Sequence, residues 1–176
     1  MERLYAGWRL AAEPGTSADG VPHAFMEPAD GLSLFETIEQ SELSAEQTYV
    51  VDRRGSAFAL LNVFPYTSGH VMVLPKRAVP SIMELTDAEH DDLWNLVRIT
   101  YKAVKDAFDP DGMNIGVNEG RAGGASVPDH LHVHVVPRWA ADTSFFTAAA
   151  EARILPMTLR DTWDRLQAVW PRSATP

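Results

Sequence analysis

Residues 130–136 read HLHVHVV, so histidine alternates with an apolar residue at a period of two. A β-strand has this period, because its successive side chains point to opposite faces of the sheet. The segment is therefore predicted to be a strand with three imidazole rings on one face and an apolar opposite face that packs against a helix. The rings belong to His130, His132 and His134, and the apolar side chains to Leu131, Val133 and Val135.

Four other segments are predicted to be strands from their apolar, β-branched and aromatic residues. Residues 49–51, 57–63 and 70–74 are separated by the turns RRGS and PYTSG, and MNIGVN follows at residues 113–118. Short turns between neighbouring strands favour antiparallel pairing.

Capping boxes mark the start of two predicted helices. Ser33 with Glu36 opens a short helix over residues 33–40, and Thr86 with Glu89 opens a long helix that ends at DPDG. The long helix has apolar residues at steps of three and four, namely Leu93, Leu96, Val97, Tyr101, Val104 and Phe108. A C-terminal helix is predicted over residues 158–170, with an apolar face made of Leu159, Trp163, Leu166 and either Val169 or Trp170.

These elements predict an α+β meander: a five-stranded, mainly antiparallel sheet with one long helix and a C-terminal helix, rather than a doubly wound sheet. Residues 11–30 are rich in Ala, Gly, Pro, Ser and acidic residues. We therefore expect residues 1–30 to form an N-terminal arm and residues 31–176 to form a single domain.

Composition excludes several classes of protein. The formal net charge is −9 and no stretch of Lys and Arg forms a stripe, so a protein that binds nucleic acid without sequence preference is not expected. No apolar run approaches the roughly 18 residues needed to span a bilayer, and the N-terminus lacks the apolar core of a signal peptide. We expect a cytoplasmic protein with no membrane partner. The chain has no cysteine, which excludes disulfides, thiolate zinc sites and cysteine nucleophiles.

Three interpretations of the histidine row are open from the residues alone. The first interpretation is a solvated surface row. The second is a zinc site on which two of the rings converge, although the following segment VVPRW supplies no further carboxylate or thiolate ligand. The third interpretation is a covalent histidine, since a neutral imidazole with a pKa near 6.5 attacks phosphorus at neutral pH. The loop before the row favours the third, because Gly120, Gly123 and Gly124 let backbone N–H groups approach an anion closely.

The segment HLHVHVV resembles the His-φ-His-φ-His-φ-φ pattern, with φ apolar, for which the histidine triad family is named. The resemblance extends to ALLNVFPYTSGHVMVLPKRAV and to GVNEGRAGGASVPDHLHVHVVPRW, and together these stretches cover roughly residues 48–139. The resemblance implies a nucleotidyl hydrolase or transferase that acts at the α-phosphorus of a nucleotide or dinucleoside polyphosphate, with no cofactor, and that forms a two-fold homodimer.

The same resemblance assigns expected catalytic roles. His132 would be the nucleophile, His134 would contact the phosphate, and His130 would hold the array in register. Ser126 would donate a hydrogen bond to the phosphate or the bridging oxygen. Its alternative role is to form hydrogen bonds only with the backbone of the loop.

Expected substrate-binding residues follow from the same alignment of motifs. Asn62 would hold the ribose hydroxyls between Leu60 and Val63, which would flank the base, but a strand cap is an equal alternative for Asn62. Asn118 would line the pocket, with a strand-end turn as its alternative, and Trp139 would be either core or a platform for the base. The remaining expected positions are His70, a buried residue of less certain role, and Gly124 and Ala125 in the phosphate loop.

Two departures from the family pattern refine the expectation. Zinc-containing branches have Cys-x-x-Cys near the N-terminus and a histidine after the basic pair, where this chain has Ser33, Glu36 and Ala78; we expect no structural metal. The spacer GGASVPD and the segment HVVPRW look more similar to actinobacterial diadenosine tetraphosphate phosphorylases, which use phosphate as the acceptor and release ADP and ATP. Those enzymes have Gly before the serine, where this chain has Ala125. A hydrolase, a phosphoramidase and a catalytically silent nucleotide-binding protein therefore stay as alternatives.

Overall fold

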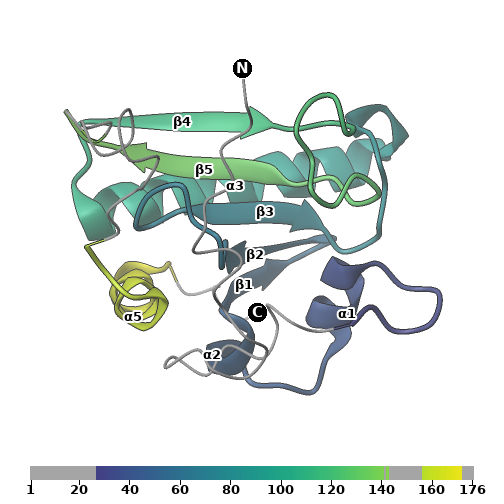
Figure 1. Ribbon diagram of the computed structural model, residues 1–176, viewed down its shortest axis with the longest axis horizontal. Helices are drawn as coiled ribbons and strands as arrows, with labels where there is room; N and C mark the ends of the chain where they lie inside the picture. Colours follow the sequence, from purple (N-terminus) through teal and green to yellow (C-terminus); the bar gives the residue numbers. More distant parts are fainter. Residues whose placement is uncertain (1–26, 141, 143–155, 172–176) are drawn as a thin grey trace, which may run out of the picture.

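Five antiparallel strands form one sheet in the order β1-β2-β3-β5-β4 (Figure 1). The computed structural model describes residues 27–140, 142 and 156–171. The strands are β1 Val50–Arg54, β2 Ala57–Leu61, β3 Val71–Pro75, β4 Gly112–Val117 and β5 Val133–Arg138. The helices are α1 Leu34–Gln40, α2 Ala45–Thr48, the 3₁₀ helix η3 Ile82–Glu84, α3 Asp87–Phe108 and α5 Leu159–Val169. The expected α+β fold is confirmed, whereas α2 and η3 had no counterpart in the prediction.

The strand order corrects the expectation of a simple meander. Strands β1, β2 and β3 follow one another as hairpins, α3 then crosses the sheet, and β5 returns between β3 and β4. The physical reason lies in β5, which is buried along most of its length, whereas β4 is half exposed. A strand with two buried faces is stable at the centre of a sheet, and the half-exposed strand occupies its edge.

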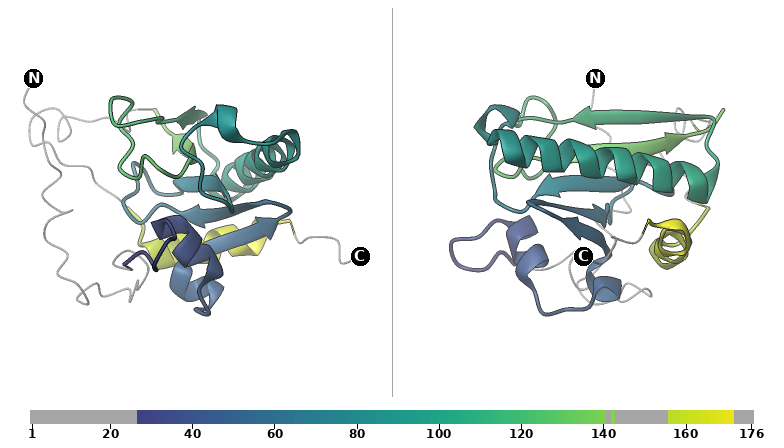
Figure 2. Two further views of the ribbon diagram at one scale, coloured as in Figure 1. Left: turned by 90° about the vertical axis from the view of Figure 1, so that its right-hand side faces the viewer. Right: turned by 180° about the vertical axis from the view of Figure 1, so that it is seen from behind.

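Helix α3 covers one face of the sheet, as the rear view shows (Figure 2). Its buried side chains pack with Leu131, Val133 and Val135, so the apolar face predicted for the histidine segment is confirmed. The predicted helical stripe is wrong at Tyr101, which is 37% exposed, while Thr100 is fully buried. A step of one residue turns a helix by about 100°, which moves Tyr101 to the flank of the buried stripe.

The short predicted helix starts at its expected capping residues, since Ser33 and Glu36 form a complete capping box at α1. The predicted C-terminal helix is α5, which follows Thr158 and packs against α3 and β1. Of the two alternatives at the end of α5, Trp170 is buried and Val169 is 38% exposed. The Trp170 indole donates a hydrogen bond of 2.7 Å to the Asp52 carboxylate, which fixes the end of the helix on β1.

Strand β5 begins three residues later than predicted, because the ladder with β3 stops at Val133. Continuing this register would place Leu131 opposite Pro75, which has no N–H to donate. The Leu131 N–H instead donates to the Val79 carbonyl at 2.7 Å, beyond the end of β3. The first two histidines therefore lie just before the strand rather than within it.

Two predictions concern the ends of the chain and its relation to membranes. The expected arm, residues 1–30, lies mostly outside the described residues. Within the described part of the chain, no helix combines the length and apolar character needed to cross a bilayer.

Candidate active site

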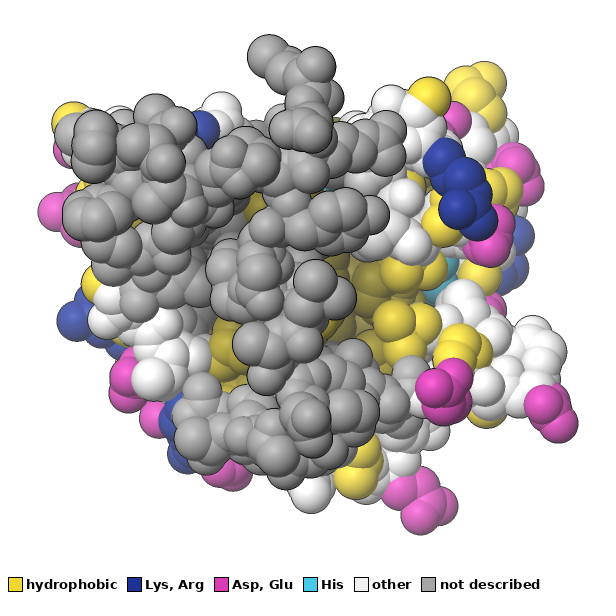
Figure 3. Space-filling model, in the orientation of Figure 1, with side chains coloured by type: hydrophobic (Ala, Val, Ile, Leu, Met, Phe, Trp, Pro, Cys, Tyr) yellow, Lys and Arg dark blue, Asp and Glu magenta, His cyan; other side chains and the backbone are white. Residues whose placement is uncertain are grey.

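The three histidines of the row are buried where β5 starts, with exposures of 0%, 4% and 7% for His130, His132 and His134. This face of the sheet also carries a second apolar cluster, to which α1 contributes Phe35 and Ile38. Burial on a sheet face excludes the interpretation of the row as a solvated surface. In the space-filling view a small histidine surface is visible among hydrophobic side chains (Figure 3).

His132 is held with one ring nitrogen engaged. Its Nδ1 lies 2.9 Å from the His130 carbonyl, and because a carbonyl oxygen only accepts, Nδ1 must donate the proton. The lone pair of the neutral ring therefore lies on Nε2, for which no hydrogen-bond partner occurs among the described residues. Burial lowers the pKa of His132, so the ring is neutral at pH 7 and has the electronic form of a nucleophile.

His130 has both ring nitrogens engaged by the protein. Its Nε2 donates to the Pro75 carbonyl at 2.8 Å, and its Nδ1 lies 2.7 Å from the Ser33 hydroxyl. Burial is the largest cause that lowers its pKa, so this ring is also neutral. A ring with no nitrogen left for substrate can support the array but cannot attack.

His134 ends a chain of hydrogen bonds that sets its tautomer. The Tyr66 backbone N–H donates to His70 Nδ1 at 3.0 Å, so the proton of a neutral His70 ring lies on Nε2. That atom is 3.0 Å from His134 Nδ1, which must then accept. The remaining nitrogen of His134, Nε2, consequently carries a proton that it can donate to a phosphate oxygen.

Asn118 faces this proton from the end of β4, with its Nδ2 atom 3.4 Å from His134 Nε2. Two donors do not form a hydrogen bond with each other. The Asn118 side-chain amide therefore has to rotate by half a turn, which exchanges its nitrogen and oxygen, before its oxygen can accept from His134 Nε2. Ile115, Gly116 and Val117 bring Asn118 here because β4 pairs with β5 in a register that opposes Gly116 to His134.

The pH dependence of stability follows from these buried rings. The pKa of His134 falls to about 4, because burial and then the neighbouring His132 disfavour the charged form, against about 6.5 in an unfolded chain. The unfolded state then binds the extra proton more tightly. The contribution of neutral His134 is complete above about pH 6.5 and is lost as the pH falls toward 4.

We expect the free energy of unfolding to drop by up to about 3 kcal/mol across this window, measured by urea titrations at stepped pH. The His134→Gln variant should show a flatter profile. Carboxylates add their own loss only at lower pH, as for Glu89, whose pKa the Arg77 guanidinium lowers to about 2. An unchanged slope between pH 6.5 and 4 in the variant would contradict the assignment to His134.

The Gly-rich loop between β4 and β5 uses more of its backbone N–H groups within the loop than expected. The N–H groups of Gly124 and Ala125 donate to the carbonyls of Arg121 and Gly120, at 3.1 and 3.2 Å. These two amides are thus already engaged, which corrects the expectation that they face an anion. Ser126 is exposed, and its hydroxyl has no hydrogen-bond partner among the described residues, so it can still donate to a substrate.

The loop nevertheless needs its glycines for steric reasons. A Cβ on Gly123 would lie 2.4 Å from the Glu119 carbonyl oxygen. Gly124 has φ +94° and its Cβ position is 4.0 Å from Asn118 Nδ2. The loop therefore passes directly beside the residue that faces His134.

The expected base and ribose residues are only partly brought together. Leu60 is buried in the cluster that includes Phe35, whereas Val63 lies beyond the end of β2 and packs against the cluster on the α3 face. Their placement on either side of a base stays a prediction. Asn62 Oδ1 accepts from the Phe64 N–H at 2.9 Å, just after β2 ends, a contact that fits the strand cap given as its alternative.

A cavity of about 590 Å³ opens beside His134 and Asn118. Trp139 is half-buried and lines it, as do Tyr66 and Arg138. Sequence reasoning missed Tyr66, whose ring centroid lies 4.7 Å from that of His70 and 5.6 Å from that of His134. It also missed the Pro75 carbonyl, because no pattern of side chains indicates a backbone acceptor.

The described residues contain no group of three or more His, Cys, Asp and Glu arranged to hold a metal ion. Ser33 and Glu36, which stand where some relatives have thiolates, are instead hydrogen-bonded to His130 and to the Ala78 N–H.

Similarity to known proteins agrees with this site. Over 174 residues the chain is 36% identical to a protein named AP-4-A phosphorylase from Mycobacterium tuberculosis, covering 98% of this chain and 86% of that protein. The asymmetrical bis(5'-nucleosyl)-tetraphosphatase of Schizosaccharomyces pombe is 42% identical over 86 residues, which are 49% of this chain and 47% of that protein. A Zn-bound histidine triad family protein from Mycobacterium smegmatis has the same fold, with a TM-score of 0.64 and 24% identity over 78% of this chain and 92% of that one. The profile of the HIT domain matches residues 44–141, and the chain belongs to this family of histidine triad proteins.

Proposed function

We propose that this protein is a nucleotidyl transferase that acts at the α-phosphate of dinucleoside polyphosphates, with diadenosine tetraphosphate phosphorolysis as its main reaction. The observation that carries the proposal is the orientation of His132, whose Nδ1 proton is committed to the His130 carbonyl. The Nε2 lone pair of His132 is thereby the buried nucleophile of the site.

The first step forms a bond between His132 Nε2 and the α-phosphorus and breaks the bond from that phosphorus to the bridging oxygen. The polyphosphate half leaves, and the nucleotidyl group stays on the ring. His134 donates a hydrogen bond through its Nε2–H group to a phosphate oxygen, where negative charge accumulates, and it keeps this proton throughout. In the second step an oxygen of the acceptor attacks phosphorus and the bond to Nε2 breaks, which regenerates neutral His132.

The cavity beside His134 is the proposed site for the nucleotide. Its volume of about 590 Å³ lies within the range of 300–1,000 Å³ that small-molecule sites typically have. Asn118 and Ser126 would contact the phosphates, and Trp139 would stack on the base.

Two observations bear on the acceptor that opens the intermediate. The similarity to a protein named AP-4-A phosphorylase extends over nearly the whole chain, which supports inorganic phosphate. The N–H groups of Gly124 and Ala125 already donate within the loop and are not available to a second anion, which favours water and makes a hydrolase the second candidate.

Product analysis separates the two candidates. We expect diadenosine tetraphosphate to be converted to ADP and ATP only when phosphate is present. AMP and ATP formed at the same rate without phosphate would identify a hydrolase, and no turnover of any dinucleoside polyphosphate despite binding would identify a nucleotide-binding protein.

We further propose that the protein acts in the cytoplasm as a homodimer. Strand β4 is the last strand of the described sheet and pairs only with β5 there, and Ile115 in β4 is 43% exposed. An unpaired strand edge with an exposed apolar side chain can pair with a second copy. The molar mass of the protein in solution tests this proposal, and a monomer at all concentrations would reject it.

A further inference from the structure

The first turn of α1 contacts the histidine row although it is far away in the sequence. The Ser33 hydroxyl lies 2.7 Å from His130 Nδ1, across a separation of 97 residues. The Phe35 ring packs edge-on against His130 with centroids 5.4 Å apart, and lies 5.7 Å from the His132 ring. The proposed mechanism assigns no role to these contacts.

The direction of the hydrogen bond between Ser33 and His130 follows from its surroundings. The Pro75 carbonyl accepts from His130 Nε2, so the neutral ring presents a lone pair at Nδ1 and the Ser33 hydroxyl must donate to it. The same hydroxyl oxygen accepts from the Glu36 backbone N–H at 3.1 Å. Ser33 thus caps α1 and holds the His130 ring with a single oxygen.

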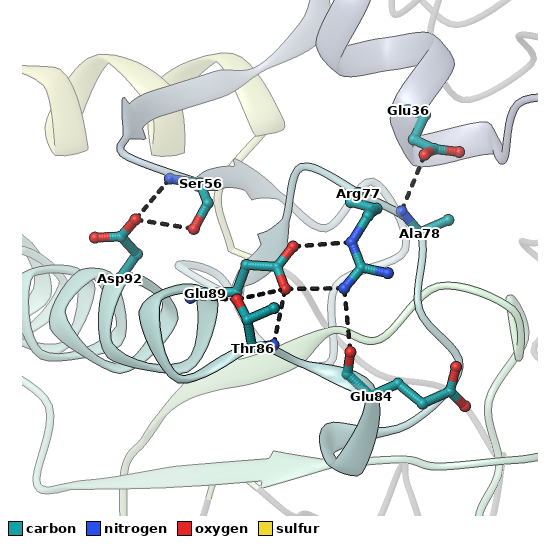
Figure 4. Close-up of polar contacts among 8 residues, drawn as sticks. All are labelled: Glu36, Ser56, Arg77, Ala78, Glu84, Thr86, Glu89 and Asp92. Atoms are coloured by element: carbon teal, nitrogen blue, oxygen red, sulfur yellow. Dashed lines mark hydrogen bonds and ion pairs between the residues drawn. The ribbon is translucent and has the colours of Figure 1, made fainter.

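Glu36 connects this turn to residues 75–79, the segment that starts at the last residue of β3. Its carboxylate accepts from the Ser33 N–H at 2.8 Å. It also accepts from the Ala78 N–H at 3.0 Å, as Figure 4 shows. Burial raises the pKa of Glu36, but the hydrogen bonds from Ala78 and Ser33 outweigh it and leave the pKa lowered. The carboxylate is therefore ionised at neutral pH and accepts both bonds.

The other side of segment 75–79 is anchored to α3. Arg77 donates to both oxygens of the Glu89 carboxylate, at 2.8 and 2.9 Å, and to the Glu84 carbonyl at 3.1 Å (Figure 4). The segment in turn holds the histidine row through the carbonyls of Pro75 and Val79. His130 is consequently held between Ser33 at the start of α1 and residues 75–79. That segment is itself held by hydrogen bonds to Glu36 and to Glu89.

The contacts that hold His130 also act on His132, through the backbone carbonyl of His130. The His130 carbonyl accepts the Nδ1 proton of His132, so the position of His130 sets the direction of His132 Nε2. Resting on the function proposed above, we propose that Ser33 is a positioning residue: its hydroxyl holds His130 so that the His130 carbonyl aims the nucleophile at phosphorus.

The test compares serine residues in two capping boxes of the same chain. Ser33→Gly removes the hydroxyl, and glycine caps helices nearly as well as serine. We expect kcat to fall by about 10- to 100-fold, the range that misplacement of a reacting group produces, with KM little changed. Ser33→Thr retains the hydroxyl and should recover most of the loss. Ser44→Gly is the matched control, because Ser44 forms an equivalent box with Gln47 at α2 and has no contact with the histidines.

Imidazole ¹⁵N spectra without substrate supply a readout that a purely structural role would leave unchanged. The wild-type protein should show His130 protonated at Nε2 and His132 at Nδ1, and Ser33→Gly should show a mixture of tautomers at His132. Three results would each overturn the proposal. They are a wild-type kcat in Ser33→Gly, an equal loss of kcat in Ser44→Gly, and a loss of kcat in Ser33→Gly while the tautomers of His130 and His132 stay unchanged. If Ser33→Gly does not fold, Ser33→Asp replaces it, since aspartate caps the helix but cannot donate when ionised.

These spectra also separate failure of this inference from failure of the proposed function. Full turnover by a variant without the His132 ring would reject the function, yet the tautomers of the Ser33 variants would still report whether Ser33 positions His132.

Discussion

The His132→Ala variant is expected to lose turnover of diadenosine tetraphosphate by a factor on the order of 10⁴–10⁶, the range seen when a catalytic nucleophile is removed. The reason is that His132 Nε2 forms the bond to phosphorus in the first step and is the leaving group in the second, and neither neighbouring ring can replace it. His130 has both nitrogens engaged, with the Pro75 carbonyl and the Ser33 hydroxyl. His134 carries its outward proton on Nε2, so it presents a donor instead of a lone pair.

Two measurements check this result. Steady-state product formation gives the rate, and acid-free quenching of wild-type protein with labelled substrate should leave one adenylyl group on the chain, located at His132 by mass spectrometry of peptides. The control is His90→Ala, because His90 lies on α3 with its side chain 51% exposed and should keep wild-type activity. Wild-type turnover by His132→Ala, or adenylyl labelling of that variant, would show that another group is the nucleophile.

The largest expected effect on stability is that of Gly69→Ala, which should lower the free energy of unfolding by about 3 kcal/mol from overpacking and backbone strain together. Gly69 has φ +87°, a conformation that residues with a Cβ rarely adopt. A Cβ there would lie 2.9 Å from two atoms of the Phe108 ring and 3.1 Å from the Pro137 ring. Both neighbours are ring atoms of packed residues, so the collision is relieved only by displacing structure.

Gly112→Ala provides the matched control for this change. Gly112 begins β4 without a positive φ, and nothing lies within 4 Å of its Cβ position, so it should unfold within about 1 kcal/mol of wild type. Urea or guanidinium titration of both variants measures the difference. Equal midpoints for the two variants would show that the close approach at Gly69 carries no cost. Because Gly69 precedes His70, a folded Gly69→Ala protein is also expected to lose activity through His134.

Features that depend on neighbours in the chain were predictable. The capping boxes at Ser33 and Thr86 join residues three apart, and the apolar face of the histidine segment follows from strand period alone. The histidine pattern with its Gly-rich loop indicated the family.

Other parts of the site could not be predicted, because they join residues distant in the chain. The Pro75 carbonyl accepts from His130 across 55 residues, His70 contacts His134 across 64, and Ser33 reaches His130 across 97. Their atoms meet only after the sheet order places β5 beside β3 and α1 packs on the same face. That order results from burial of most of β5, a property of the folded core that no local pattern contains.

The sequence by itself therefore determined which chemical groups the site contains: three histidines on one face, a glycine-rich loop with a serine, and no thiol. Only the tertiary structure decided which nitrogen of each ring carries its proton. A tautomer is set by the acceptor or donor that each nitrogen meets, and those partners are backbone carbonyls, a distant hydroxyl and a distant ring. That assignment separates His132, with a lone pair available for attack, from His130 and His134, which support it.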